Sequence, residues 1–179
     1  NLKNKIPELP DDRKKRYINE YNLSNYDASV LTSDKSVSDF FDNVIKVDTS
    51  LKQSSKIVVN WITSELFSLL NENNLEINDS PISPENLGKL VKLIKDDIIS
   101  GKIAKDILLE MFETKKDPEK IIDEKGLQQV TDISQIENIV DEVINENKKM
   151  VEQYLSGKDK LLGFFVGQSM KKSKGKANP

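Results

Sequence analysis

The sequence predicts an all-α protein made of two small helical domains, a helix bundle followed by a helical tail domain. Three observations support this fold class. Apolar residues recur at helical spacing in the long segments, polar cap residues followed by proline and glutamate mark helix starts, and strand signals are few. A hydrophobic content of 36% beside a charged content of 32% suits small bundles of amphipathic helices.

The first helix is expected directly after an extended segment over residues 1–10, which two prolines bracket. Asp11 and Asp12 begin this helix, because acidic side chains are favoured at the positive end of the helix dipole, and it runs through Tyr21. A short turn of helix over residues 26–31 follows.

Two longer helices come next. Ser33 and Asp34 cap the first, which runs through Val47 and carries Val37, Phe40, Phe41, Val44 and Ile45 at helical spacing. The second covers residues 50–73, and its apolar stripe consists of Ile57, Trp61, Ile62, Leu66, Leu69 and Leu70. We interpret the single tryptophan as a core anchor.

A polar connector over residues 74–82 leads to a clear helix start, with Ser83 as N-cap and Pro84 at the first helical position. The apolar residues of this helix are Leu87, Leu90, Val91, Leu93, Ile94 and Ile98. We expect Gly101 to break it, and helix to resume over residues 102–114.

The domain boundary is predicted at the charged turn over residues 115–117, giving a helical domain over 1–116 and a tail domain over 117–179. Asp117 followed by proline and glutamate starts the first tail helix, and Gly126 ends it in a left-handed conformation.

Three more helices are expected in the tail domain. Asp132 and Gln135 resemble a capping box for a helix through Asn145, with Ile133, Ile136, Ile139, Val140, Val143 and Ile144 facing inward. The next helix carries Met150, Val151, Tyr154 and Leu155 and ends at Gly157. The last helix is basic.

The strongest charge signal is at the carboxyl end. Residues 158–179 hold six lysines and one acid, a net charge of about +5 in a chain whose overall charge is −3. Such a cluster suits contact with phosphate groups, and Gly163 and Gly167 would allow close packing or approach. The alternative is a solvated, fraying tail. The candidate phosphate-binding residues are Lys158, Lys160, Lys171, Lys172, Lys174 and Lys176.

Lys102 and Lys105 form a second candidate site. They lie one turn apart at the start of a helix, where cations oppose the helix dipole. Because this interaction with the helix dipole is slightly destabilising, the two lysines suggest a function. The alternative is that both side chains are simply solvated.

Catalysis by this chain is not expected. It has no cysteine and no histidine, and its seven glycines form no nucleotide-binding loop. Adjacent acid pairs diverge by about 100° around a helix, so we predict no metal site and no catalytic residue. No apolar run approaches the length of a membrane span, and no signal peptide opens the chain. A start without methionine and an end at proline suggest a piece of a longer protein.

Several strings together resemble one family, the B subunits of the aspartyl/glutamyl-tRNA amidotransferases (GatB). The similarity covers nearly the whole chain in order, and the strings ISGKIAK, EKGLQQ and GFFVGQ are the most specific. The matching segments are PELPDDRKKRY (7–17), YDASVLTSDKSVSDFF (26–41), ISPENLGKLVKLI (82–94), ISGKIAKDIL (99–108), DPEKIIDEKGLQQVTD (117–132), IVDEVI (139–144) and GKDKLLGFFVGQSMKKSKGKANP (157–179).

The resemblance implies a helical domain followed by a YqeY-like tail domain that recognises the elbow of tRNA around the D-loop. Members of the family carry an N-terminal cradle domain, absent from this sequence, that uses ATP and Mg to activate glutamate or aspartate misacylated on tRNA(Gln) or tRNA(Asn). Ammonia from the amidase subunit, called A, then completes the amidation. The implied partners are tRNA, the amidase and the small C subunit of the heterotrimer, with no DNA and no membrane, in a bacterial cytoplasm or an organelle. Relatives continue beyond Pro179 into a further short helix.

The resemblance assigns the six carboxyl-terminal lysines to tRNA phosphates and leaves open whether Lys102 and Lys105 touch RNA. Phe164 and Phe165 are interpreted as core residues, because both belong to an apolar run, and the alternative is that they stack on bases. The alternative function is a helical protein–protein interaction module that assembles the amidotransferase heterotrimer without touching RNA. An independent enzyme is the least supported hypothesis.

Overall fold

The computed structural model describes residues 8–127 and 133–174, and the regular elements within them are helical, which confirms the all-α prediction. Two short 3₁₀ turns, Thr49–Lys52 and Ile77–Asp79, and a π-helical stretch, Trp61–Leu66, accompany the α-helices. The α-helices are α1 (Pro10–Tyr21), α2 (Asn25–Thr32), α3 (Lys35–Val47), α4 (Ser55–Asn60), α5 (Phe67–Glu72), α6 (Pro84–Lys95), α7 (Gly101–Thr114), α8 (Pro118–Lys125), α9 (Ile133–Glu146), α10 (Lys148–Leu155) and α11 (Leu161–Lys172).

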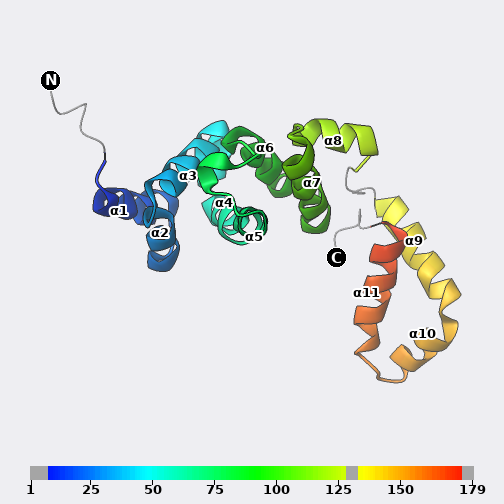
Figure 1. Cartoon of the computed structure of the whole chain (residues 1–179). Coiled ribbons are helices and arrows are strands. Elements are labelled where there is room, and N and C mark those ends of the chain that lie inside the picture. The colour runs from blue at the N-terminus through cyan, green and yellow to red at the C-terminus, as the bar shows by residue number, and fades with distance from the viewer. Residues whose placement is uncertain (1–7, 128–132, 175–179) are drawn as a thin grey trace.

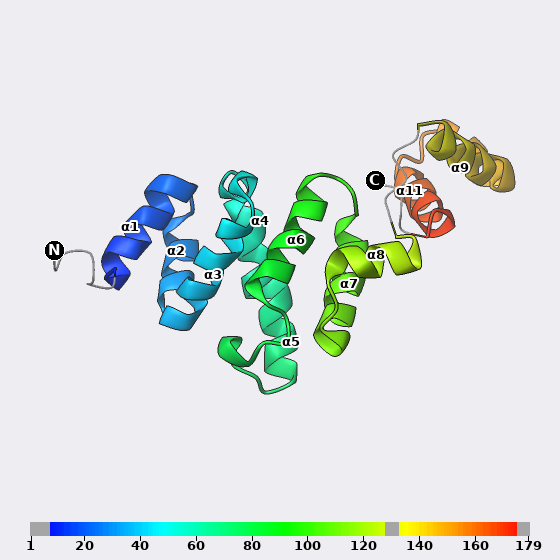
Figure 2. The same ribbon diagram turned by 90° about the horizontal axis from the view of Figure 1, so that it is seen from above.

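Helices α1–α8 follow one another in an elongated array, and α9–α11 form a second group beyond α8 (Figures 1 and 2). Most of the extended segment over residues 1–10, the proposed cap Asp132 and the candidate Lys176 lie outside the described residues. Within the residues that the structure describes, no helix is both long and apolar enough to cross a membrane.

One continuous apolar core runs through the array, from Tyr17 in α1 to Ile122 in α8. Its centre is the packing of α3 against α6, where Gly88 allows a close approach. A Cβ atom added at Gly88 would lie 2.7 Å from Val47 Cγ2 and 3.2 Å from the Val44 carbonyl oxygen. Both distances are shorter than normal van der Waals contact, so only glycine fits at this crossing without a shift.

Several predicted helix ends are confirmed. Ser83 caps α6, because its Oγ accepts a hydrogen bond from the Asn86 N–H at 3.2 Å, and Pro84 is the first helical residue. Asp34 caps α3 in the same manner through the Ser36 N–H. Gly126 ends α8 with a φ of 58°, the left-handed conformation expected of it.

The predicted interruption and the helix expected over residues 102–114 are both present, but the prediction that Gly101 makes the interruption was wrong. Helix α6 already ends at Lys95, and Asp97 takes the left-handed conformation with a φ of 54°. Ser100 then caps α7 by accepting a hydrogen bond from the Ile103 N–H at 3.3 Å, and Gly101 is the first residue of that new helix. The aspartate makes the turn because a short polar side chain tolerates this conformation better than most.

The expected helix over residues 50–73 is present with a different internal geometry. It begins with a 3₁₀ turn, and the stretch Trp61–Leu66 is π-helical, which adds a residue to one turn. Thr63 Oγ1 donates a hydrogen bond to the Val59 carbonyl oxygen at 2.9 Å within the widened turn. Trp61 is buried at 8% exposure, as expected of a core anchor.

Helix α8 packs with the array although the sequence assigned it to the tail domain. Ile121 and Ile122 join the common core, and Lys89 of α6 forms an ion pair with Asp117 at 2.7 Å. The division of the chain at residue 116 stays a prediction. In the structure, the residues up to α8 contribute to one core.

A charged network joins the start of the described chain to α1 and α3. Arg16 donates hydrogen bonds to Glu8 at 2.7 Å and to Asp42 at 2.9 Å, and its guanidinium lies 4.9 Å from the centre of the Tyr17 ring. The hydrogen bond from Arg16 is the largest cause that lowers the pKa of Glu8. These contacts fix the chain direction at residue 8 relative to α3.

Candidate nucleic-acid interface

The last helix, α11, packs on both α9 and α10. Val143 of α9 is almost completely buried, and the Phe165 ring meets Tyr154 of α10 edge-on with ring centres 6.1 Å apart. Phe164 and Phe165 contact each other and are both half-buried, so they pack against neighbouring side chains but are not the fully buried core residues that the sequence suggested. One side of α11 is thereby fixed against its neighbours.

The other side of α11 is open. A Cβ atom added at Gly163 or Gly167 would meet no heavy atom within 4 Å, and both residues are exposed. The sequence suggested that these glycines allow close packing or close approach. They pack against no other element among the described residues, so the closeness that they permit is available to another molecule.

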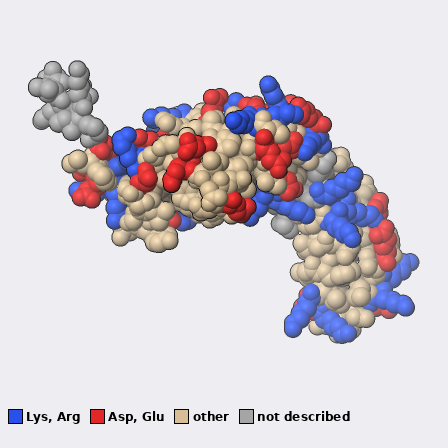
Figure 3. Space-filling view, viewed as in Figure 1, with Lys and Arg blue, Asp and Glu red and all other residues tan. Residues whose placement is uncertain are grey.

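Three of the candidate lysines are free to bind an anion. Lys160, Lys171 and Lys174 are exposed and form no ion pair within residues 8–127 and 133–174. Lys158 is also exposed and donates a long hydrogen bond of 3.4 Å to the Gln153 side chain. Figure 3 shows basic side chains gathered at the end of this group where α10 meets α11 in Figure 1.

Lys172 has a different environment. Its ammonium group lies 2.8 Å from a Glu142 carboxylate oxygen and 2.6 Å from one of Glu146, both on α9. The hydrogen bonds to Glu142 and Glu146 raise the pKa of Lys172, so it stays charged. Sequence reasoning missed these two partners, although their spacing of four residues places them on one face of a helix.

Lys102 and Lys105 lie on the first turns of α7, in the array and not in the tail group. Lys105 Nζ forms an ion pair with Glu65 of the π-helical stretch at 2.9 Å, and sequence reasoning missed this partner as well. Lys102 is exposed and has no ion pair within the part of the chain that the structure describes. The two candidate lysine sites are therefore on different elements.

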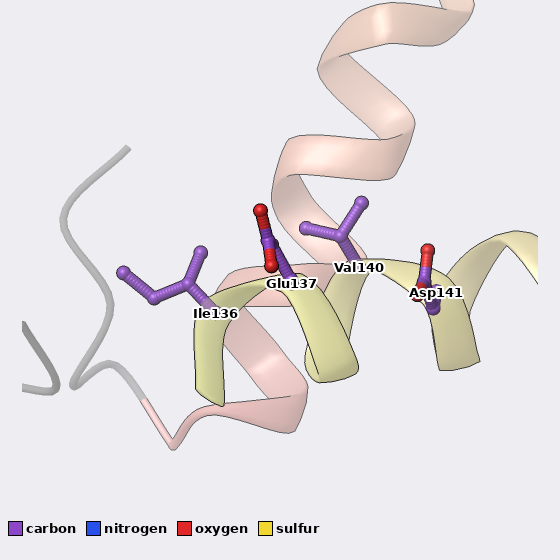
Figure 4. Close-up of a pocket in the computed structure, with 4 residues that line it drawn as sticks. All are labelled: Ile136, Glu137, Val140 and Asp141. Atoms are coloured by element: carbon purple, nitrogen blue, oxygen red, sulfur yellow. The ribbon is translucent and has the colours of Figure 1, made fainter. Parts of the chain in front are cut away.

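A shallow hollow of about 490 Å³ lies on α9, and Figure 4 shows the four side chains that line it. Ile136 and Val140 supply apolar surface, and Glu137 and Asp141 supply two carboxylates. Because both charged groups are anionic, this surface disfavours phosphate. Among the described residues, no group of three or more acidic side chains is placed to hold a metal ion.

Comparison with known proteins gives one consistent result. A family model described as the GatB domain matches residues 39–179. The aspartyl/glutamyl-tRNA(Asn/Gln) amidotransferase B subunit of Rickettsia rickettsii (strain Sheila Smith) is 52% identical over 178 residues, which is 99% of this chain and 36% of that protein. The corresponding B subunits of Pelagibacter ubique and Alkalilimnicola ehrlichii are 49% and 48% identical over 99% and 97% of this chain, and again 36% of each relative is covered.

This chain thus spans about a third of the length of the relatives that it matches. The agreement between the family model and these relatives confirms the resemblance seen in the individual sequence strings. The chain belongs to the GatB family, the B subunits of the aspartyl/glutamyl-tRNA amidotransferases.

Proposed function

We propose that this chain is the part of an amidotransferase B subunit that holds tRNA while Glu-tRNA(Gln) or Asp-tRNA(Asn) is converted to Gln-tRNA(Gln) or Asn-tRNA(Asn). The chemistry, with ATP and Mg, would take place on another part of the longer protein. The A and C subunits would be the protein partners. Membership of the GatB family supports this assignment of reaction and partners.

The observation that carries the RNA-binding role is the set of exposed lysines at the two ends of α11, which have no ion pair among the described residues. Lys160 precedes the helix, and Lys171 and Lys174 lie at or just beyond its end, so cationic groups are available at both ends of it. Lysines bind phosphates as point charges and release the counterions of the polyanion. Contacts of this kind recognise the shape and backbone of a folded RNA and read few base edges, as expected for the tRNA elbow.

A salt titration tests this function. We expect the 179-residue chain to bind deacylated tRNA(Gln) or tRNA(Asn) with a Kd of roughly 10⁻⁴ to 10⁻⁶ M, the range of contacts dominated by phosphates. Each phosphate contact contributes about −0.7 to −0.9 to the slope of log K against log salt concentration. Affinity that does not depend on salt would overturn the proposal.

A triple variant separates the tail lysines from general charge. We expect Lys160→Ala, Lys171→Ala and Lys174→Ala together to weaken tRNA binding strongly and to flatten its salt dependence. The matched control replaces three exposed lysines of the array, which removes the same charge and should have a much smaller effect. The control residues are Lys15, Lys46 and Lys52.

The alternative, a module for assembly of the heterotrimer, is supported by the exposed apolar residues Leu162 and Val166 on α11. The same triple variant distinguishes the two functions. If tRNA binding were unchanged and association with the amidase were lost, the assembly role would replace the RNA-binding role.

A further inference from the structure

We infer that α11 contacts RNA with a single face, formed by Lys160, Gly163, Gly167 and Lys171, and that Lys172 belongs to the contacts that join α11 to α9. This inference rests on the proposed function and deepens it, because it names the RNA-facing side of the helix. It also divides two lysines that are adjacent in sequence and identical in charge.

The spacing of the four residues defines the RNA-facing side. They follow one another at intervals of three, four and four residues, which keeps them on one side of a helix with 3.6 residues per turn. All four are exposed. With a rise of about 1.5 Å per residue, the two lysines are about 16 Å apart along the axis, so they contact different phosphates.

The glycines between the lysines let a phosphate backbone approach the helix itself. No described atom lies within 4 Å of where a Cβ of Gly163 or Gly167 would be. A larger side chain at either position would stand between the RNA and the helix backbone. The face therefore combines two flanking charges with a smooth central surface, and its charge is complementary to RNA.

Lys172 is placed on a different side. It is about 100° further around the helix than Lys171, and its ammonium group lies between the carboxylates of Glu142 and Glu146. Only 29% of its side chain is exposed. Contact with a phosphate would leave two carboxylates without their cation and would bring them close to the anionic RNA, so Lys172 serves to join α11 to α9.

Two single variants of the 179-residue chain test this division. With tRNA(Gln) or tRNA(Asn) as the probe, Lys171→Ala should reduce the slope of the salt dependence by about 0.7 to 0.9, which corresponds to about a 5- to 8-fold loss of affinity at 0.1 M salt. Lys172→Ala should leave the slope of the salt dependence unchanged and lower the melting temperature, because the contact between α9 and α11 is weakened. Lys172→Arg should restore the melting temperature. Lys52→Ala, in an exposed position of the array, is the control for loss of one charge.

A third variant tests the central surface without changing charge. In Gly167→Leu the new side chain enters open space, and leucine has a higher helix propensity than glycine, so the helix remains folded. We expect it to weaken tRNA binding several-fold with no loss of melting temperature. Unchanged binding would refute close approach at the glycines.

The outcomes distinguish this inference from the function on which it rests. If Lys172→Ala reduces the salt slope as much as Lys171→Ala, the division into two faces is wrong and RNA binding by the tail still stands. If the unmodified chain shows no salt-dependent binding at all, the proposed function itself fails.

Discussion

Gly88 offers the sharpest test of how the helical array is packed. In Gly88→Ala, the new methyl group would lie 2.7 Å from Val47 Cγ2 and 2.8 Å from Val47 Cβ, about 1 Å closer than the optimal separation of carbon atoms. Val47 cannot turn aside easily, because a β-branched side chain in a helix has one strongly preferred rotamer. The Val44 carbonyl oxygen, at 3.2 Å, is backbone and moves only with α3.

The magnitude follows from two opposing effects. Overpacking of this kind costs about 2–3 kcal/mol, the upper part of its usual range, because backbone and a stiff side chain are both involved. Replacing glycine with alanine inside a helix returns about 1 kcal/mol. The free energy of unfolding should therefore fall by about 1–2 kcal/mol, which lowers the melting temperature by about 2–8 °C in a protein of this size.

The control is Gly101→Ala, in the first turn of α7 and in the same array. Its added Cβ meets nothing within 4 Å, so only the lower entropy of the unfolded chain acts, and stability should rise by about 0.4–1 kcal/mol. Thermal unfolding followed by far-UV circular dichroism measures both variants. If Gly88→Ala is as stable as the unmodified chain or more stable, the close approach of α3 and α6 is not as described.

Two further predictions concern charged side chains of the array. Arg16→Met should destabilise the chain by about 1.5–3 kcal/mol in urea or thermal unfolding, because Glu8 and Asp42 lose a charged hydrogen-bond partner, and Lys15→Met should change little. The hydrogen bond from Lys56 on α4 is the main cause that lowers the pKa of the buried Asp27. The ionised Asp27 therefore stabilises the fold fully above its unfolded pKa of about 4, and this stabilisation is lost as the pH falls through the lower folded pKa. Asp27→Asn should therefore be less stable at neutral pH and show a shallower loss of melting temperature in acid, and an unaltered acid profile would contradict this assignment.

Much of the fold could be predicted because helix ends depend on local chemistry. The cap at Ser83 and the left-handed Gly126 each follow from a few neighbouring residues, and both are confirmed. The end of α6 could not be predicted in this way. Asp97 adopts a conformation that several residue types tolerate, whereas Gly101 looked like a stop and is only the start of the next helix.

The candidate interface was predictable in its charge and not in its geometry. Counting lysines identifies a basic end, but the count treats Lys171 and Lys172 as equals. Only the position of α9 shows that one of them is exposed and the other lies between two carboxylates. Likewise, Gly88 and Gly163 are both helical glycines in the sequence, and the structure alone shows which one touches a neighbour.

The widened turn at residues 61–66 has a consequence for changes in chain length. Residues before it, such as Val58, and residues after it, such as Leu70, both reach the core because one extra residue is accommodated between them. Deleting a single residue there would let a regular helix form and would keep both halves facing the core, because the eleven remaining steps of about 100° come to nearly three whole turns. Deletion of one exposed residue of this turn, such as Ser64, should thus be tolerated far better than deletion of one residue from the regular helices α3 or α6.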